Sequence, residues 1–164
     1  MIEYSQFCHQ LQTDVLSLLR QWPLCVGINL LQENILQLVI LHTDIPNCEL
    51  RVRITYNTVY QEPFLIFQIW RTELLQDDIE GERIWFPSDL SRVLNTARFS
   101  IGLDYIDPQN KQVWYSLHPC DTAEILGTKH VEAYLLRWCS VYFTAFQHDF
   151  SSLFVRKCTE RRKS

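Results

Sequence analysis

Apolar residues near the start of the chain recur at helical spacing. Steps of mostly three or four residues join Phe7, Leu11, Val15, Leu18, Leu19 and Trp22. This spacing predicts an amphipathic helix that ends at Pro23, because proline cannot continue a helix. A longer stripe follows near the other end of the chain and comprises Val131, Tyr134, Leu135, Trp138, Val141, Tyr142, Phe146, Phe150 and Leu153. It predicts a second helix, whose aromatic residues we interpret as core.

Between these two helices the period changes to that of β-strands. Ile35–His42 is an apolar run of strand length, and Phe64–Trp70 is a dense run that suits a central strand. In Leu50–Tyr56 apolar residues alternate with polar ones, as in a half-exposed strand. Phe99–Ile106 and Gln112–His118 flank a polar turn, which predicts a hairpin. The sequence therefore predicts one α+β domain, with an N-terminal helix and a long C-terminal helix on an antiparallel sheet of about four to six strands.

The segment between these strands, Thr72–Ser100, is less regular. It contains an acidic stretch, Asp77–Glu82, which is most simply a solvated connection. Asp89–Asn95 is predicted to form a short helix.

The composition is that of a single globular domain spanning residues 1–164. Hydrophobic residues make up 47% of the chain and charged residues 21%. The longest interval without charge, residues 21–32, is shorter than the roughly 18–20 apolar residues of a spanning helix, so no membrane span is expected. The net charge is −4, although residues 156–164 are basic and are expected to form a frayed tail. The more acidic body disfavours nucleic acid as the main ligand.

The six cysteines bear on the compartment in which the protein works. The chain starts without the basic and then apolar segments of a secretory signal, so we expect a reducing, cytoplasmic environment and free thiols. No CxxC pair is present, and the His and Cys residues lack the paired spacing of structural zinc sites. No metal is therefore expected. The sequence also lacks a P-loop and a dinucleotide-binding fingerprint, and no bound cofactor is expected.

One short segment, Trp114–Thr122, is typical of a reactive site. Pro119 should end the preceding strand, because it cannot donate to the strand ladder. Asp121 or Thr122 can cap a following helix, which places Cys120 where the helix dipole favours a thiolate. His118 lies two residues earlier and points to the same side of an extended chain. The carboxylate of Asp121 opposes the thiolate, so a moderately reactive thiol is expected.

These residues alone leave several interpretations open. A cysteine at a strand end is often only a packing residue. Cys120 with His118 would also fit a thiol hydrolase, although such pairs usually draw the histidine from a distant segment. A third possibility is a non-catalytic adaptor that binds its partner by strand addition at a sheet edge.

Four segments together resemble one enzyme family. They are Val113–Thr122, Thr55–Pro63, Phe99–Asp104 and Tyr134–Trp138, in the order and over nearly the whole length expected. The sequence resembles the autophagy-related protein 10 family, the ubiquitin-conjugating-type enzymes of the autophagy conjugation system. The resemblance implies the ubiquitin-conjugating-enzyme-like version of the α+β fold.

The resemblance also implies a function and roles for individual residues. Such an enzyme accepts the ubiquitin-like autophagy-related protein 12 from its activating enzyme, autophagy-related protein 7, and transfers it to a lysine of autophagy-related protein 5. Cys120 would be the thioester-forming nucleophile, with Thr122 and Asp121 in supporting roles. ATP is used by the activating enzyme and not by this chain. The expected location is the cytoplasm, with recruitment to the site of autophagosome assembly.

The motif around Cys120 departs from that of ordinary ubiquitin-conjugating enzymes. Those enzymes place a His-Pro-Asn motif several residues before the cysteine, and its asparagine assists the attacking lysine. Here the His-Pro pair directly precedes Cys120 and the asparagine is absent. His118 and Tyr60 are the candidates to take over its part, since the tyrosine of the Val-Tyr-x-Glu-Pro segment lies near the cysteine in this family.

Overall fold

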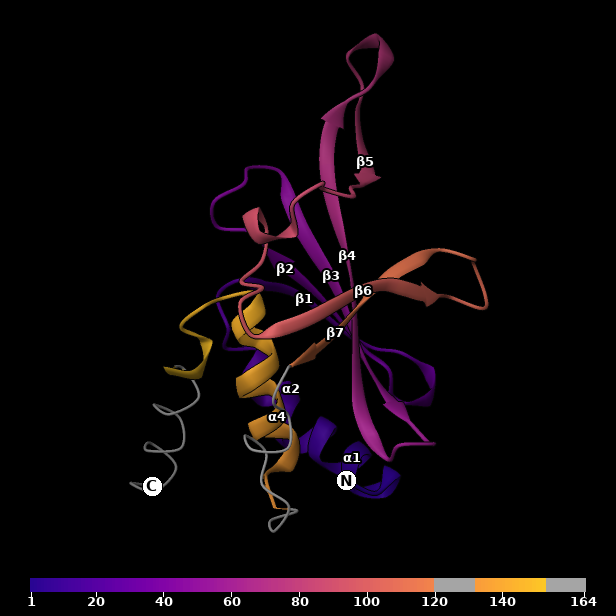
Figure 1. Ribbon diagram of the computed structural model, residues 1–164, viewed down its shortest axis with the longest axis vertical. Helices are drawn as coiled ribbons and strands as arrows, with labels where there is room; N and C mark the ends of the chain where they lie inside the picture. The colour runs from indigo at the N-terminus through magenta and orange to yellow at the C-terminus, as the bar shows by residue number, and fades with distance from the viewer. Residues whose placement is uncertain (120–131, 153–164) are drawn as a thin grey trace.

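The computed structural model describes residues 1–119 and 132–152, which form a twisted antiparallel sheet and the helices that cover one of its faces (Figure 1). The strands are β1 (Cys25–Leu30), β2 (Leu36–Leu41), β3 (Cys48–Asn57), β4 (Glu62–Leu74), β5 (Glu80–Ile84), β6 (Phe99–Ile106) and β7 (Val113–Pro119). The helices are α1 (Tyr4–Gln10), α2 (Leu16–Leu19) and α4 (Tyr134–Tyr142). This arrangement confirms the predicted α+β class and its two terminal helices.

The N-terminal helix is a single rod with an irregular middle. A π-helical segment, Leu11–Val15, joins α1 to α2. The hydroxyl of Thr13 donates a hydrogen bond of 2.8 Å to the carbonyl of His9, the kind of competing bond that disturbs a helix locally. The last helical residue is Leu19, so the rod ends one turn before the predicted limit at Pro23.

The C-terminal helix is shorter than the sequence predicts. After α4 the chain makes one 3₁₀ turn, Phe143–Ala145, and residues 146–149 are not helical. The predicted helix is therefore not continuous, although residues 150–152 are helical again. Of the later aromatic residues of the stripe, Phe150 packs just past the end of the N-terminal rod, where its ring lies 4.7 Å from that of Trp22. The aromatic residues within α4 are buried, as predicted, whereas Val131 and Leu153 lie outside the described residues.

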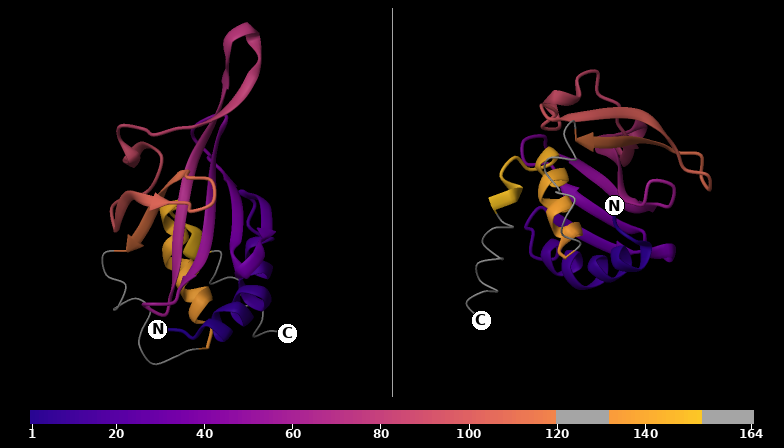
Figure 2. Two further views of the ribbon diagram at one scale, coloured as in Figure 1. Left: turned by 90° about the vertical axis from the view of Figure 1, so that its right-hand side faces the viewer. Right: turned by 60° about the horizontal axis from the view of Figure 1, so that its bottom comes forward.

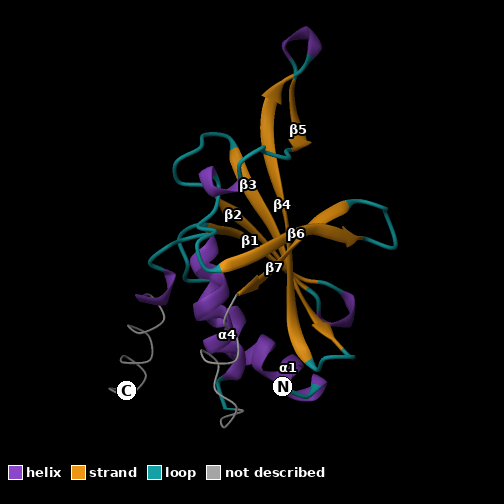
Figure 3. Ribbon diagram, in the orientation of Figure 1, coloured by secondary structure: helices purple, strands orange, loops and turns teal. Residues whose placement is uncertain are grey.

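The sheet has seven strands, one more than the upper end of the predicted range (Figure 3). Its order is β1-β2-β3-β4-β7-β6, and β5 pairs with the far half of β4. Two strands were not predicted, namely β1 and β5. The acidic stretch is thus not a loop throughout, because Glu80 and Glu82 belong to β5 and pair with β4. Together, β5 and the end of β4 form a hairpin that projects from the body (Figure 1).

The helices cover the face of the sheet that carries the apolar residues of β3 (Figure 2). Leu50, Val52 and Ile54 are buried against the helices, whereas Arg51 and Arg53 lie on the other face. The alternation predicted for this strand is therefore confirmed. Along β4 the sheet changes partner, because β7 pairs with residues 65–67 and β5 with residues 70–74. This change brings the end of β7 beside the start of β4.

Candidate active site

The end of β7 carries His118, one of the two predicted site residues that the structure describes; the other is Tyr60. Residues 114–117 of this strand are buried, and His118 is the first exposed one. Pro119 is buried, lies opposite Phe99 of β6, and is the last residue of the strand, as predicted. A proline here ends the ladder, because it has no N–H to donate. The imidazole of His118 is therefore exposed at the end of β7, a strand that lies between β4 and β6 in the sheet.

Strand register places the turn that contains Tyr60 at the same end of the sheet. Leu117 of β7 pairs with Leu65 of β4, and the two strands are antiparallel. One step further along β7 thus corresponds to one step back along β4, which sets His118 opposite Phe64. Their rings agree with this register, since their centroids lie 5.8 Å apart. Tyr60 comes four residues before Phe64, in the turn between β3 and β4.

The turn that carries Tyr60 is held from within by an asparagine. The side-chain oxygen of Asn57 accepts the backbone N–H groups of Val59 and Tyr60, at 3.0 and 3.1 Å. Gln61 then adopts a left-handed conformation with φ of 50°. The side chain of Tyr60 projects from this turn and is 66% exposed, so its hydroxyl is accessible to a bound partner.

Aromatic and polar side chains on the open face of the sheet support His118. The ring of Phe64 lies between His118 and Tyr105, with the Tyr105 centroid at 5.9 Å. Two residues before His118 on β7, the hydroxyl of Ser116 donates a 2.6 Å hydrogen bond to the carboxylate of Asp104, which lies in an irregular part of β6. Phe64 and Asp104 were not predicted as neighbours of the candidate site, and Ser116 was predicted only as part of the segment Trp114–Thr122. Only the pairing of β4, β6 and β7 brings them together, and no local pattern reports that pairing.

A negative charge lies near this end of β4 on the helix side. Burial, and then the carboxylate of Glu62, raise the pKa of Tyr134 at the start of α4. The same two causes raise the pKa of Tyr142. Both phenols are therefore neutral at physiological pH.

The remaining predicted site residues, Cys120, Asp121 and Thr122, lie outside the described residues. Burial makes several of the described thiols poor nucleophiles. It raises the pKa of Cys25 to about 11, and it also raises the pKa of Cys48 and of Cys139. A thiol with so high a pKa is almost entirely protonated at neutral pH.

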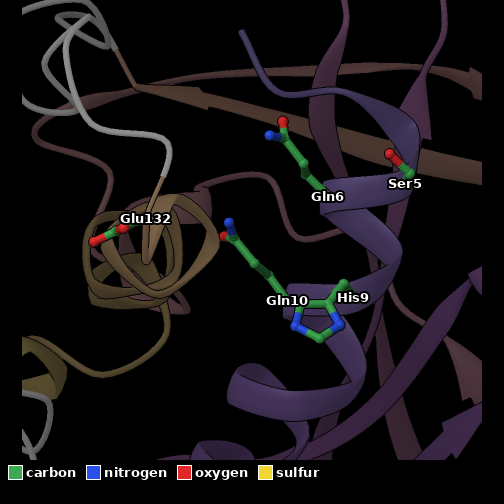
Figure 4. A pocket seen from close by; sticks show the side chains of 5 residues that line it. All are labelled: Ser5, Gln6, His9, Gln10 and Glu132. Atoms are coloured by element: carbon green, nitrogen blue, oxygen red, sulfur yellow. The ribbon is translucent and has the colours of Figure 1, made fainter.

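A cavity of about 340 Å³ lies between α1 and the residues that precede α4 (Figure 4). Polar side chains line it, namely those of Ser5, Gln6, His9, Gln10 and Glu132. Gln10 also accepts the backbone N–H of Leu135, a bond that ties α1 to α4. The cavity includes neither His118 nor Tyr60. Within residues 1–119 and 132–152, no three His, Cys, Asp or Glu side chains gather as metal ligands would.

Known protein families distinguish between the conjugating enzyme, the thiol hydrolase and the non-catalytic adaptor that the sequence left open. Residues 29–150 match the family model described as "Autophagocytosis associated protein, active-site domain". The chain belongs to this family. It is 32% identical over 158 residues to the ubiquitin-like-conjugating enzyme ATG10 of Saccharomyces cerevisiae, and the match covers 87% of this chain and 94% of that protein.

Solved structures of autophagic conjugating enzymes have the same fold as this autophagy-family chain. The solution structure of KmAtg10 matches with a TM-score of 0.74 and 32% identity, covering 92% of this chain and 98% of that one. The crystal structure of the autophagic E2 Atg10 matches with a TM-score of 0.70 and 33% identity, covering 89% and 96%. The predicted family and fold are therefore confirmed.

These matches also establish the class of activity. This member of the autophagy family is a ubiquitin-like-conjugating enzyme, that is, a transferase of the E2 type. The thiol hydrolase and the non-catalytic adaptor considered from the sequence are thereby set aside. None of the helices that the structure describes has the length and apolar character needed to cross a membrane.

Proposed function

We propose that the chain carries autophagy-related protein 12 as a thioester on Cys120. In this proposal the modifier comes from its activating enzyme, autophagy-related protein 7, and goes to a lysine of autophagy-related protein 5. The family membership supports the type of reaction. The structure supports the end of β7 as the place on the chain where the reaction takes place. The observation that carries the proposal is that β7 ends at Pro119, directly before Cys120, and that the side chain of His118 is exposed at this strand end. The expected setting remains the cytoplasm, where thiols stay reduced.

The first step is a transfer of the acyl group from one thiol to another, that is, a thiol–thioester exchange. The sulfur of Cys120 attacks the carbonyl carbon that joins the modifier to the activating enzyme. A new sulfur–carbon bond forms, the thiol of the activating enzyme leaves, and the proton of Cys120 balances the departing thiolate. This step needs only an accessible sulfur, because the two thioesters are of similar energy.

The second step is attack by an amine and needs more from the enzyme. The lysine nitrogen bonds to the thioester carbon, loses a proton, and expels Cys120 as a thiol. His118 is proposed to orient the lysine or take its proton, and Tyr60 to position it from the neighbouring turn. His118 or backbone amides after Cys120 would donate to the oxyanion that forms. Asp121 and Thr122 are proposed to help place the lysine.

Substitution of the nucleophile tests the proposal directly. Wild type mixed with activating enzyme, modifier and ATP should give an adduct that thiols remove on gel electrophoresis. Cys120→Ser should give an adduct that resists thiols and is cleaved by alkali. Cys25→Ser, which removes a partly buried thiol, should load like wild type. The nucleophile assignment fails if Cys120→Ser still forms a thiol-sensitive adduct, or if wild type forms none.

Two further variants separate loading from transfer. His118→Ala and Tyr60→Ala should slow the loss of modifier from the preloaded enzyme to the acceptor lysine and affect loading less. An equal loss of both steps would indicate damaged folding. An adduct that decays equally fast with and without the acceptor would instead identify a hydrolase.

A further inference from the structure

The residues that precede α1 lie against the turn that carries Tyr60. The backbone N–H of Ile2 donates a 2.9 Å hydrogen bond to the carbonyl of Gln61, the residue after Tyr60. The carbonyl of Ile2 in turn accepts a 2.7 Å hydrogen bond from the hydroxyl of Tyr56, near the end of β3. Ile2 is only 2% exposed, so these bonds are shielded from water. Ile2 therefore links the last residues of β3 to the turn between β3 and β4.

A cluster of three rings holds this bridge in place. The ring of Tyr56 lies 5.3 Å from the ring of Tyr4 and 5.3 Å from that of Phe7, both in α1. Tilted ring pairs at this distance are favourable beyond the area that they bury. The first turn of α1 is thus packed on β3, and the hydroxyl of Tyr56 is fixed beneath the carbonyl of Ile2.

The turn itself requires support from outside. Gln61 has φ of 50°, a left-handed conformation that costs a residue other than glycine about 1 kcal/mol or more. Asn57 supports the turn only on the side that precedes Gln61. The side chain of Tyr60 is two-thirds exposed, so its direction depends mainly on the backbone of this turn. The bond from Ile2 supports that backbone on the other side.

We infer that Ile2 and Tyr56 are positioning residues for Tyr60, and that through this bridge the segment before α1 tunes transfer of the modifier to lysine. The inference rests on the role proposed for Tyr60. Neither residue needs to touch the substrate. Loading of Cys120 should not depend on the bridge, because thioester exchange does not require Tyr60 in the proposed mechanism.

Two pairs of variants test the bridge. In each pair one variant removes a hydrogen bond of the bridge and the other serves as its control. Tyr56→Phe removes the hydroxyl and keeps the ring, and Tyr4→Phe is its control within the same cluster. Ile2→Pro removes both the side chain and the N–H donor, whereas Ile2→Ala removes side-chain bulk and keeps the donor. The measurement is the single-turnover rate at which preloaded enzyme passes the modifier to the acceptor, beside the rate of loading.

The bridge predicts different results within each pair. Tyr56→Phe should slow transfer by about 3- to 10-fold at saturating acceptor, within the range that a displacement below 1 Å produces, while loading stays near wild type. Tyr4→Phe should leave transfer near wild type. Ile2→Pro should slow transfer more than Ile2→Ala does, and it should speed amide hydrogen exchange at Val59 and Tyr60. Equal transfer rates within both pairs would overturn the inference.

A double-mutant cycle separates positioning from general destabilisation. If the bridge acts through Tyr60, Tyr56→Phe should cost little further transfer rate in a Tyr60→Ala background. Full additivity, or a transfer defect that merely follows the loss of unfolding free energy, would show that Tyr56 is only a packing residue. Wild type that forms no adduct would refute the proposed function itself, and that outcome differs from a loaded enzyme whose transfer ignores the bridge.

Discussion

Replacing Asp107 with asparagine should loosen the hairpin formed by β6 and β7, which carries His118. One carboxylate oxygen of Asp107 lies 2.9 Å from the guanidinium of Arg53 on β3, and the other accepts the N–H of Gln109 at 2.8 Å. The Asp107 side chain is 8% exposed and that of Arg53 is 22% exposed. This ion pair is therefore largely shielded and links the hairpin to the middle of the sheet.

The loss of stability in Asp107→Asn depends on the interactions that Arg53 still makes in the variant. Removing one partner of a buried ion pair costs about 3–5 kcal/mol when the other charge is left alone. Arg53 still donates to Gln37 at 3.0 Å and lies 4.5 Å above the ring of Trp114. We therefore expect Asp107→Asn to lower the free energy of unfolding by about 2–3 kcal/mol and Tm by about 5–10 °C.

The pH dependence gives an independent check of the same variant. The N–H of Gln109 first, and then Arg53, hold the pKa of Asp107 below its ordinary value. A lowered pKa stabilises the folded protein fully above the unfolded value of about 3.9, and this stabilisation is lost as the pH falls through the folded value. The difference between wild type and Asp107→Asn should thus be full at pH 7 and shrink below about pH 4.

Urea unfolding at a series of pH values measures this difference. Glu73→Gln is a suitable control, since its pair with Arg83 is exposed and 3.9 Å long and should contribute less than about 0.5 kcal/mol. If Asp107→Asn costs no more than this control at pH 7, or if its cost stays constant down to pH 3, the reasoning is refuted.

Two further predictions concern the helices and the thiols. Gln10→Leu should cost about 1–3 kcal/mol in urea unfolding, because it leaves the buried N–H of Leu135 without its 2.8 Å acceptor, whereas Gln10→Glu keeps an acceptor and should cost less. In native protein at pH 8, iodoacetamide should leave Cys139 unmodified and label Cys25 slowly, since burial raises the pKa of Cys139 and sets that of Cys25 at about 11. Peptide mass spectrometry before and after unfolding would test this, and labelling of native Cys139 at the unfolded rate would contradict it.

The sequence pattern predicts strands well where it shows either an alternation, as in β3, or a continuous apolar run, as in β4. Leu50, Val52 and Ile54 of β3 meet the helices, and the residues between them meet solvent or charged partners, so the alternation is visible. The strands β1 and β5 are stabilised differently. Both lie at edges, and β5 is mostly exposed and carries charged residues. Backbone pairing with a neighbour holds such strands, and backbone pairing leaves little trace in the order of side chains.

The candidate site divides in the same way into local and non-local parts. The strand end at Pro119 follows from that residue itself and was predicted, whereas the exposure of His118 is seen only in the structure. Phe64, whose ring lies against His118, became visible only through the register of β4 with β7. The bond from Ile2 to Gln61 joins segments that are far apart in the sequence and involves only backbone atoms, so no residue type announces it.

The outer face of β7 is covered by contacts in its middle and exposed at its end. The same strand can therefore stabilise the sheet and carry a residue proposed to act in transfer of the modifier. Up to Ser116 its outer side is covered, since Asp104 of β6 accepts the hydroxyl of Ser116 and Arg53 lies over Trp114. At His118 that cover ends, and the side chain meets solvent. A carrier of a large acyl group needs a reactive end that a bulky partner can reach and a support that does not yield. In the proposed function both needs are met within a few residues of β7, because the contacts of Trp114 and Ser116 hold the strand just before the exposed His118.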